Sequence, residues 1–261
     1  MIKKDIAILI SCHKPCKTLN TEIVSPIQVG AGLAKTRLPD MLHDDEGDNI
    51  SDKNKRYCEL TGQYWAWKNM DADYYGFFHY RRYLSFADKV FMRKPFYDVQ
   101  IEKLTDESIE KFKLNDKDMR ELITKYDVIT PQKSFCGSNY LHYKTAKSHY
   151  IKDLDFCLDV IKRDYPDMAK VATKYMISPF AYFCNMFIMK KEIFNNYCTW
   201  LFDILTKHEE AMPCSDYNTQ AYRVSGFLAE RLCGIYLTWL CQNKALKIKK
   251  LQRIKINNTD I

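Results

Sequence analysis

An apolar run at residues 74–78 ends in a histidine and two arginines, His79, Arg81 and Arg82. The run predicts a buried strand, and open α/β sheets bind their ligands where the strands end. The charge of a diphosphate can be neutralised by Mg²⁺ or by forked hydrogen bonds from arginine. We therefore expect Arg81 and Arg82 to bind a diphosphate without a metal, with His79 beside them. Neighbouring strand residues point to opposite faces, so His79 and Arg81 are the favoured pair. The alternative is that both arginines are solvated or form salt bridges.

Two carboxylates are candidates for the general base of a reaction at such a site. Glu230 is the first candidate, because its apolar neighbours Phe227 and Leu232 would bury it in part. Asp216 is the second. The alternative for Glu230 is a salt bridge with Arg231 on a solvated helix face.

The triplet Asp71-Ala72-Asp73 has the residue types of a metal site. It precedes the apolar run and falls in a predicted turn between a helix and a strand, where aspartate is favoured for turn geometry alone. We therefore predict no metal ligands and no required cofactor. A divalent metal, Mn²⁺ or Mg²⁺, is the alternative.

Further strands and one helix are predicted around these residues. Short apolar runs at 6–10 and 27–29 indicate strands, and Tyr57, Leu60 and Tyr64 recur at helical spacing within a helix predicted over residues 51–69. Polar or small residues at these strand ends and along this helix are the expected contacts of a nucleotide and its sugar: Ser11, His13, Gly30, Ala31, Asp48, Asn49, Asn54 and Glu59.

The rest of the chain alternates helical and strand patterns, which is typical of an α/β protein. Strands are predicted at 126–130 and 183–189, and helices at 116–126, 145–165, 191–207 and 218–243. The tail at 246–256 alternates Lys or Arg with Leu or Ile. It predicts either an edge strand or an element at a membrane surface.

Three aromatic or imidazole side chains are candidates for binding a second substrate. His142 and His149 have tyrosine neighbours, although a lone histidine on a helix is more often structural. Trp65 and Trp67 lie on different faces of the predicted helix, so one is expected in the core and the other against a sugar. Trp65 is the candidate chosen for the sugar contact.

Composition excludes several classes of protein. The 261 residues carry a net charge of +7, but the basic residues are spread along the chain, so we expect no nucleic-acid partner. The ten cysteines follow no secretory leader, and no apolar stretch approaches the length of a membrane span. A reduced, cytoplasmic protein with its cysteines mostly in the core is the expectation.

Four segments resemble a known family: ISDKNKRYCELTGQYWAWKN at 50–69, YYGFFHYRRYL at 74–84, CNMFIMKKEIFNNYCTWLFDIL at 184–205 and YRVSGFLAERL at 222–232. They are similar to the capsular and exopolysaccharide biosynthesis glycosyltransferases long described only as a domain of unknown function, some of which are galactofuranosyltransferases. The resemblance implies one GT-A-like domain over residues 1–261, with a central mixed, mostly parallel sheet flanked by helices. The charged segment at about 88–125 is the least typical part, where acceptor specificity would vary, and residues 246–261 form a basic tail.

The resemblance also implies an activity. A hexosyltransferase, expected to be inverting, would move galactofuranose or galactose from a UDP-sugar to a lipid-linked or growing surface polysaccharide. The basic tail would then hold the protein at the inner face of the cell membrane. The competing expectation is a protein of the same fold that binds or assembles glycans without catalysis.

Overall fold

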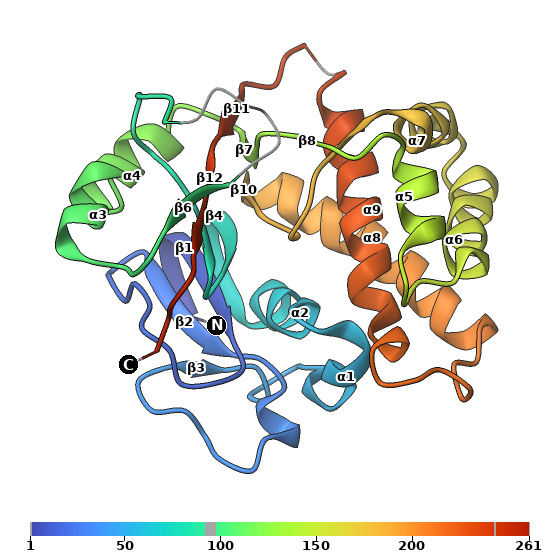
Figure 1. Cartoon of the computed structure of the whole chain (residues 1–261), viewed down its shortest axis with the longest axis horizontal. Coiled ribbons are helices and arrows are strands. Elements are labelled where there is room, and N and C mark those ends of the chain that lie inside the picture. The colour runs from blue at the N-terminus through green and yellow to red at the C-terminus, as the bar shows by residue number, and fades with distance from the viewer. Residues whose placement is uncertain (1, 92–97, 243, 261) are drawn as a thin grey trace.

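A mixed sheet forms the centre of the molecule (Figure 1). The computed structural model describes residues 2–91, 98–242 and 244–260. Over these residues the main path of the sheet has the order β11-β7-β10-β4-β1-β2-β3, and within that path only β10 runs antiparallel to its neighbours. The strands of the sheet are β1 (Ile2–Cys12), β2 (Val24–Gln28), β3 (Leu42–His43), β4 (Met70–His79), β5 (Arg82–Leu84), β6 (Val99–Ile101), β7 (Val128–Pro131), β10 (Phe187–Lys190), β11 (Ile248–Leu251) and β12 (Arg253–Ile256).

Helices flank the sheet, and most of them gather on one side of it (Figure 1). A small two-stranded sheet, β8 (Ser134–Phe135) with β9 (Phe180–Ala181), lies among them. The helices are α1 (Asn54–Tyr57), α2 (Leu60–Asn69), α3 (Asp106–Lys111), α4 (Asp116–Ile123), α5 (Asn139–Thr145), α6 (Ile151–Asp164), α7 (Pro166–Ile177), α8 (Lys191–Ala211) and α9 (Val224–Leu240).

Side chains alternate between two cores along the central strands, as the pleat of a strand requires. Leu9 of β1 and Phe77 of β4 belong to the core that α6, α7, α8 and α9 share. Ile8 and Phe78 belong to the core on the opposite face, under α4 and β12. Burial on both faces explains why these strands read as continuous apolar runs in the sequence. The expected α/β class is confirmed.

The helix predicted over residues 51–69 is broken. A 3₁₀ turn at Ser51–Lys53 leads into α1, and α2 begins only at Leu60. Between them Cys58 has φ 54°, a backbone conformation that no α-helix contains. The predicted uninterrupted helix was therefore wrong at this point.

The Asp71-Ala72-Asp73 triplet lies inside β4 and not in a turn. β4 begins at Met70 because the amino-terminal part of β1 pairs with it, with Lys3 opposite Asp71. Asp71 accepts a hydrogen bond from Lys191, and Asp73 is exposed. The triplet stands near the start of β4, at the other end of the strand from His79, so the predicted turn is corrected.

Other boundaries moved in smaller ways. The helix expected at 145–165 corresponds to α6, which begins only at Ile151, because Thr145 is the last residue of α5 and residues 146–150 separate the two helices. The helix expected at 218–243 begins with a 3₁₀ turn at Ala221–Arg223 before α9. Residue 243 lies outside the described residues, as do residues 92–97 of the charged segment expected at 88–125. The described part of that segment holds β6, α3 and α4.

The tail forms two strands of the sheet. β11 pairs with β7 at the edge of the main path, and β12 lies between β5 and β6. Its apolar residues Leu251, Ile254 and Ile256 are buried. The edge-strand expectation therefore holds for β11. Over the described residues, no helix combines the length and apolar character needed to cross a bilayer.

Candidate active site

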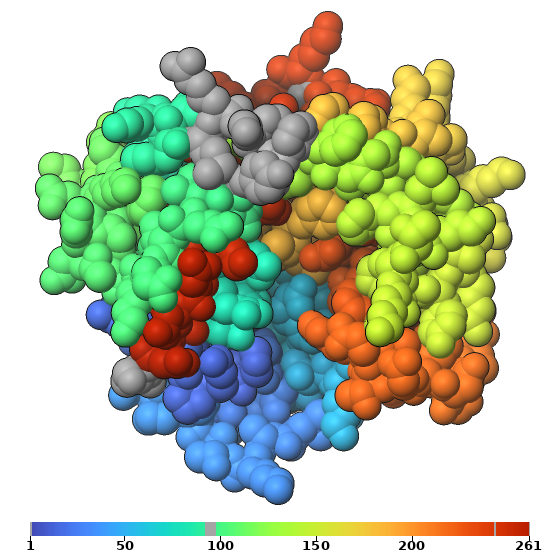
Figure 2. Space-filling view, viewed as in Figure 1, coloured from blue at the N-terminus to red at the C-terminus, as the bar shows by residue number. Residues whose placement is uncertain are grey.

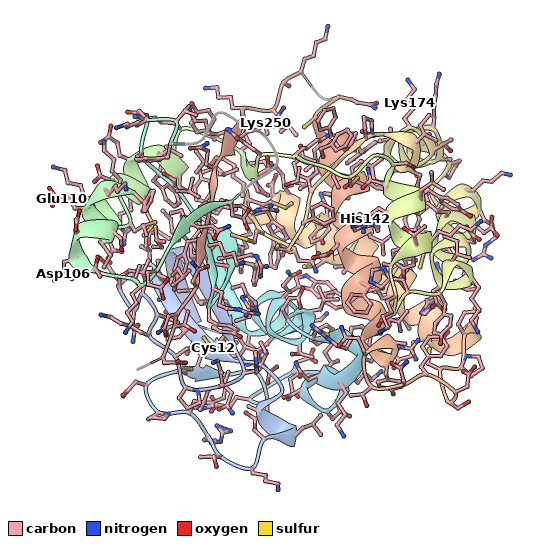
Figure 3. The ribbon with its side chains drawn as sticks, in the orientation of Figure 1. Cys12, Asp106, Glu110, His142, Lys174 and Lys250 are labelled. Atoms are coloured by element: carbon pink, nitrogen blue, oxygen red, sulfur yellow. The ribbon has the colours of Figure 1, made fainter. Side chains whose placement is uncertain are left out.

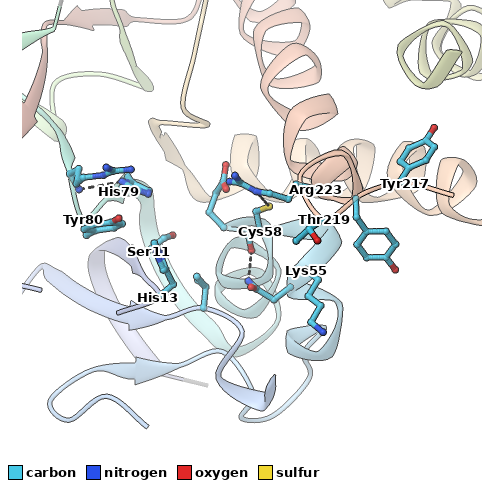
Figure 4. Close-up of a pocket in the computed structure, with 14 residues that line it drawn as sticks. Ser11, His13, Lys55, Cys58, His79, Tyr80, Tyr217, Thr219 and Arg223 are labelled. Atoms are coloured by element: carbon cyan, nitrogen blue, oxygen red, sulfur yellow. Dashed lines mark hydrogen bonds between the residues drawn. The ribbon is translucent and has the colours of Figure 1, made fainter. Parts of the chain in front are cut away.

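A pocket of about 760 Å³ opens where β1 and β4 end (Figure 4). One wall comes from these strand ends, and the other comes from α1 and the segment 217–223. Figure 2 shows the same face of the molecule hollowed between the C-terminal strands and α5. The residues that line the pocket are Ser11, His13, Val29, Asn54, Lys55, Cys58, Glu59, His79, Tyr80, Arg81, Tyr217, Thr219, Tyr222 and Arg223.

The hairpin between β4 and β5 presents His79 and Arg81 to the pocket. His79 pairs with Arg82 across the hairpin, which leaves Tyr80 and Arg81 as its two turn residues. The Arg81 guanidinium lies 5.1 Å from the centre of the Tyr80 ring, and the Arg81 backbone N–H donates to His79 Nδ1 at 3.2 Å. The favoured pair thus lines the pocket.

Arg82 does not line the pocket. Its Nε lies 3.8 Å from an Asp98 carboxylate oxygen, so this arginine is engaged outside the pocket. A salt bridge was the alternative expected for both Arg81 and Arg82. Of the two, Arg82 is the one that has such a carboxylate partner among the described residues.

Both histidines of the pocket are neutral at neutral pH. Burial of the ring, with the positive charges of Arg82 and Arg81, lowers the pKa of His79 to about 3. Partial desolvation and Arg81 also lower the pKa of His13. An anion in the pocket would favour the protonated form of both rings, because opposite charge stabilises the charged form.

Arg223 supplies a second guanidinium from the opposite wall. Its Nε donates to Cys58 Sγ at 3.3 Å, and its guanidinium lies 5.5 Å from the centre of the Phe227 ring. Arg223 was not among the residues predicted for the site. Its position directly before a long apolar helix, beside Tyr222, was the available signal. Lys55 is the third cationic side chain that lines the pocket.

Two carboxylates approach one another beside Arg223. Glu59 lines the pocket and accepts a hydrogen bond from Asn185 Nδ2 at 2.7 Å. Glu230 accepts one from the Cys184 backbone N–H at 2.8 Å. Cys184 and Asn185 both have positive φ, 75° and 47°, an uncommon conformation that concentrates at functional sites.

The pKa of Glu59 is raised. Burial is the main cause, and the nearby Glu230 adds to it. The two carboxylates therefore stand in different surroundings, because Glu230 keeps a quarter of its side chain exposed, 25%, with a carboxylate oxygen 3.8 Å from Arg231 Nη1.

Gly30 and Ala31 are not among the residues that line the pocket, and the carboxylate of Asp44 already binds their backbone N–H groups. Their backbone N–H groups donate to the buried Asp44 carboxylate at 2.7 Å and 2.9 Å. Ser51 donates to the same carboxylate. These groups are satisfied internally, so the expected contact with a nucleotide is corrected.

Asp48 and Asn49 also lie outside the pocket lining. Asp48 accepts a hydrogen bond from the Tyr64 hydroxyl, and the Asn49 side chain bonds to the backbone of Gly47 and of Ser51. They shape the loop before α1.

The residues expected to bind the acceptor lie in different parts of the structure. Trp65 is 3% exposed and donates its indole N–H to the Glu46 carbonyl, so it is the core tryptophan and not a sugar contact. Trp67 stacks on Phe202. His142 lies on α5 toward α9 (Figure 3), where its Nδ1 is 2.8 Å from Arg231 Nη2.

His149 and Asp216 complete the set of predicted residues. The His149 ring packs against Tyr143 and Phe227, and burial lowers its pKa to about 4. Asp216 is exposed and does not line the pocket, although the next residue, Tyr217, does. Within the described ranges, no group of three or more His, Cys, Asp or Glu side chains is placed to hold a metal ion.

Residues 7–243 match the model of a protein family described as "Domain of unknown function (DUF4422)". The chain belongs to this family. A solved structure described as the WbbM bifunctional glycosyltransferase in its apo form is 36% identical to the chain, with a TM-score of 0.90 over 98% of it. The chain spans 46% of the WbbM chain, about half of its length. The comparison with curated proteins finds no match. This member of the DUF4422 family thus has the α/β fold of part of a glycosyltransferase, as the resemblance implied.

Proposed function

We propose that the chain is a glycosyltransferase that moves a sugar from a nucleotide-sugar donor to a growing polysaccharide. The observation that carries the proposal is the pocket at the ends of β1 and β4, with guanidinium groups on both walls. A likeness of 0.90 in TM-score to a bifunctional glycosyltransferase supports it.

The donor diphosphate would lie between Arg81 and Arg223. Hydrogen bonds from arginine to phosphate are charge-assisted and strong, and they would stabilise the charge that develops as the nucleoside diphosphate leaves. His13 and His79 would add donors once the anion raises the pKa of their rings. UDP-galactofuranose or UDP-galactose is the donor that the family resemblance favours.

Glu230 is the proposed general base. It would take the proton of the acceptor hydroxyl as that oxygen attacks the anomeric carbon. The bond from this carbon to the diphosphate oxygen breaks with inversion, and UDP leaves. Glu59, held by Asn185 at the pocket wall, would bind the donor. Asp216 remains the second candidate for the base.

The acceptor would enter from the hollow between α5 and the C-terminal strands, where His142 and His149 are the proposed contacts. A lipid-linked glycan as acceptor would place the protein at the cytoplasmic face of a membrane. Exposed lysines near β11 (Lys244, Lys247 and Lys250) would then contribute about 1 kcal/mol each near an anionic surface.

The decisive experiment measures donor binding and UDP release on the same variants. We expect slow release of UDP from UDP-galactose or UDP-galactofuranose even without acceptor. Arg81→Ala and Arg223→Ala should each weaken donor binding about tenfold or more, since a hydrogen bond to a charged group contributes about 1.5–3 kcal/mol. Arg82→Ala is the matched control, because Arg82 lies next to Arg81 in the chain and outside the pocket, and it should bind donor normally.

The outcomes separate the alternatives. Donor binding that survives both alanine substitutions would remove the diphosphate site from this pocket. Glycan binding without any UDP release would favour the non-catalytic glycan-binding protein. Loss of activity in EDTA that Mn²⁺ restores would show that a metal shares the diphosphate charge.

A further inference from the structure

A second cavity, of about 490 Å³, lies at the opposite end of α9 from the donor pocket. It is bounded by the start of α7, by α8, by the end of α9 and by Leu246, and it shares no lining residue with the donor pocket. α9 has 17 residues, so at about 1.5 Å per residue the two pockets stand about 25 Å apart along the helix.

Four aromatic rings form one continuous side of this cavity. Tyr165 contacts Trp200 with ring centres 6.2 Å apart, Trp200 contacts Tyr236 at 5.3 Å, and Tyr236 contacts Trp239 at 5.5 Å. Trp200 and Tyr236 are each 4% exposed, whereas Trp239 is 37% exposed. The series therefore runs from a buried floor to an open rim.

The floor contains a hydrogen-bond donor without a partner. Trp200 Nε1 is buried and makes no hydrogen bond to any residue that the structure describes. Buried indole N–H groups normally find an acceptor, and one left unsatisfied is destabilising. Trp200 lines the cavity, and a ligand oxygen that reaches this N–H would satisfy it.

The charges around the cavity restrict the class of ligand. Asp164 and Asp167 line it with the amide of Asn196, and none of the described lysines or arginines is among its lining residues. Asp164 is paired with Arg163 and Lys207, so Asp167 is the carboxylate that disfavours a phosphate or another anion here. Together with the Trp200 N–H, these polar groups disfavour a plain hydrocarbon chain. A neutral ring that has hydroxyl groups and apolar faces meets every condition, because its hydroxyls bond to the carboxylates and amide while its C–H faces pack on the aromatic rings.

We infer that this cavity is a glycan-binding site, separate from the donor pocket, which takes a neutral sugar unit against Trp239 and Trp200. Its role rests on the proposed function: a growing polysaccharide held here would keep its other units near the donor pocket by raising their effective concentration. Long acceptors would then bind more tightly than short ones without any new contact at the reacting end.

The test measures sugar binding without donor, by tryptophan fluorescence and saturation-transfer NMR. The probes are galactose, glucose, mannose, N-acetylglucosamine and galactose tetrasaccharides. We expect saturable binding that Trp239→Ala weakens about tenfold or more, since it removes the rim of the site. Trp200→Phe keeps a ring but loses the N–H and should weaken binding about threefold to tenfold. Trp67→Phe is the matched control, because Trp67 lines neither cavity, and it should bind sugar normally.

UDP-sugar affinity is measured on the same proteins and should be equal in all of them. Absence of saturable sugar binding by the wild-type chain, or equal binding by the Trp239→Ala variant, overturns the inference. Self-association that Trp239→Ala disperses would assign this face to a second copy of the chain and overturn it as well. A wild-type chain that binds sugar but not UDP-sugar would instead contradict the proposed donor site. The two failures are therefore distinguishable.

Discussion

Glu59 and Glu230 both carry carboxylates, but they lie in different surroundings, which suit different roles. Glu59 is held by a side-chain amide and has a raised pKa because it is buried, whereas Glu230 is partly exposed and held by one backbone N–H. Groups whose environments differ in this way commonly divide acid, base and binding roles between them.

Glu230→Gln should lower the turnover of UDP-sugar by about a hundredfold or more, since a general base contributes roughly 10²–10⁴ in rate. Donor affinity should stay within about twofold, because the substitution keeps the shape and removes only the basic oxygen. UDP release under saturating donor gives the rate, and calorimetry gives the affinity. Asp216→Asn serves as the comparison; a larger loss there than in Glu230→Gln would transfer the role to Asp216.

His79 should make donor binding depend on pH. The pKa of the ring in the free protein is about 3, below the ordinary value of 6.5, and a bound diphosphate raises it. At a pH between about 3 and the raised pKa, binding therefore takes up a proton, and affinity for a UDP-sugar, whose diphosphate stays ionised, should rise as the pH falls through that range. Calorimetry in two buffers of different ionisation enthalpy counts the proton, and an unchanged pH slope in His79→Gln would contradict this account.

The same ring sets the stability of the unliganded chain in acid. Because the pKa of His79 is lower in the folded than in the unfolded state, the unfolded state binds the proton first as the pH falls. The stability that the neutral ring permits is complete above about pH 6.5 and is lost between that pH and about 3. Thermal melts of the wild type against His79→Gln should separate in this window and converge above it.

The strand-end residues of the pocket, together with Asn54 and Glu59 of the opposite wall, could be predicted from the sequence, but the segment 217–223 of that wall could not. Ser11, His13, His79 and Arg81 each follow an apolar run, and the carboxyl ends of parallel strands meet at one edge, so local patterns predicted their meeting. Arg223 reaches the same pocket from more than a hundred residues away. Tertiary packing brings Arg223 to the pocket, and the spacing of residues within a short segment does not predict such packing.

At the scale of elements, the break between α1 and α2 turns Asn54, Cys58 and Glu59 toward the pocket. Cys58 adopts φ 54° and ψ −130°, and its Sγ accepts the hydrogen bond from Arg223. The apolar period of Tyr57, Leu60 and Tyr64 passes across this break unchanged. Sequence periodicity therefore predicted the helix but not its interruption, because the partner of Cys58 at the break, Arg223, is distant in sequence.

Substitutions at Cys58 should reverse the usual helical order of preference. Inside a helix valine is more favourable than glycine, but a β-branched residue at positive φ is strained, whereas glycine is not. We expect Cys58→Gly to be more stable than Cys58→Val by about 2 kcal/mol. Chemical denaturation measures the difference, and a Val variant as stable as the Gly variant would show that the break is not needed.

At the scale of the whole molecule, the C-terminal strands complete the sheet. β11 covers the edge of β7, and β12 joins β5 to β6 with Ile254 and Ile256 buried. The α/β class could be predicted from alternating helices and strands, but these pairings join residues more than 100 positions apart, and sequence patterns do not specify register at that distance.

Truncation after residue 245 should therefore unfold the protein or lower its melting temperature steeply, because it exposes edges of β7, β5 and β6 and the core under β12. Circular dichroism melts measure this effect. Replacing Lys244, Lys247 and Lys250 together by alanine is the control, since all three are exposed, and it should leave the melting temperature nearly unchanged. A stable truncated chain would show that the fold does not need the tail, and it would favour the alternative of an element at a membrane surface.

The position of β12 also bears on how the molecule is made. β5 and β6 are synthesised more than 150 residues before the strand that lies between them. Domains fold as units during synthesis only once their partner segments have emerged, so the nascent chain leaves the ribosome with these edges uncovered. Until residue 256 has emerged, the edges of β5 and β6 can pair with other chains. We therefore expect chaperones to bind β5 and β6 for longer during translation than the other strands of the sheet.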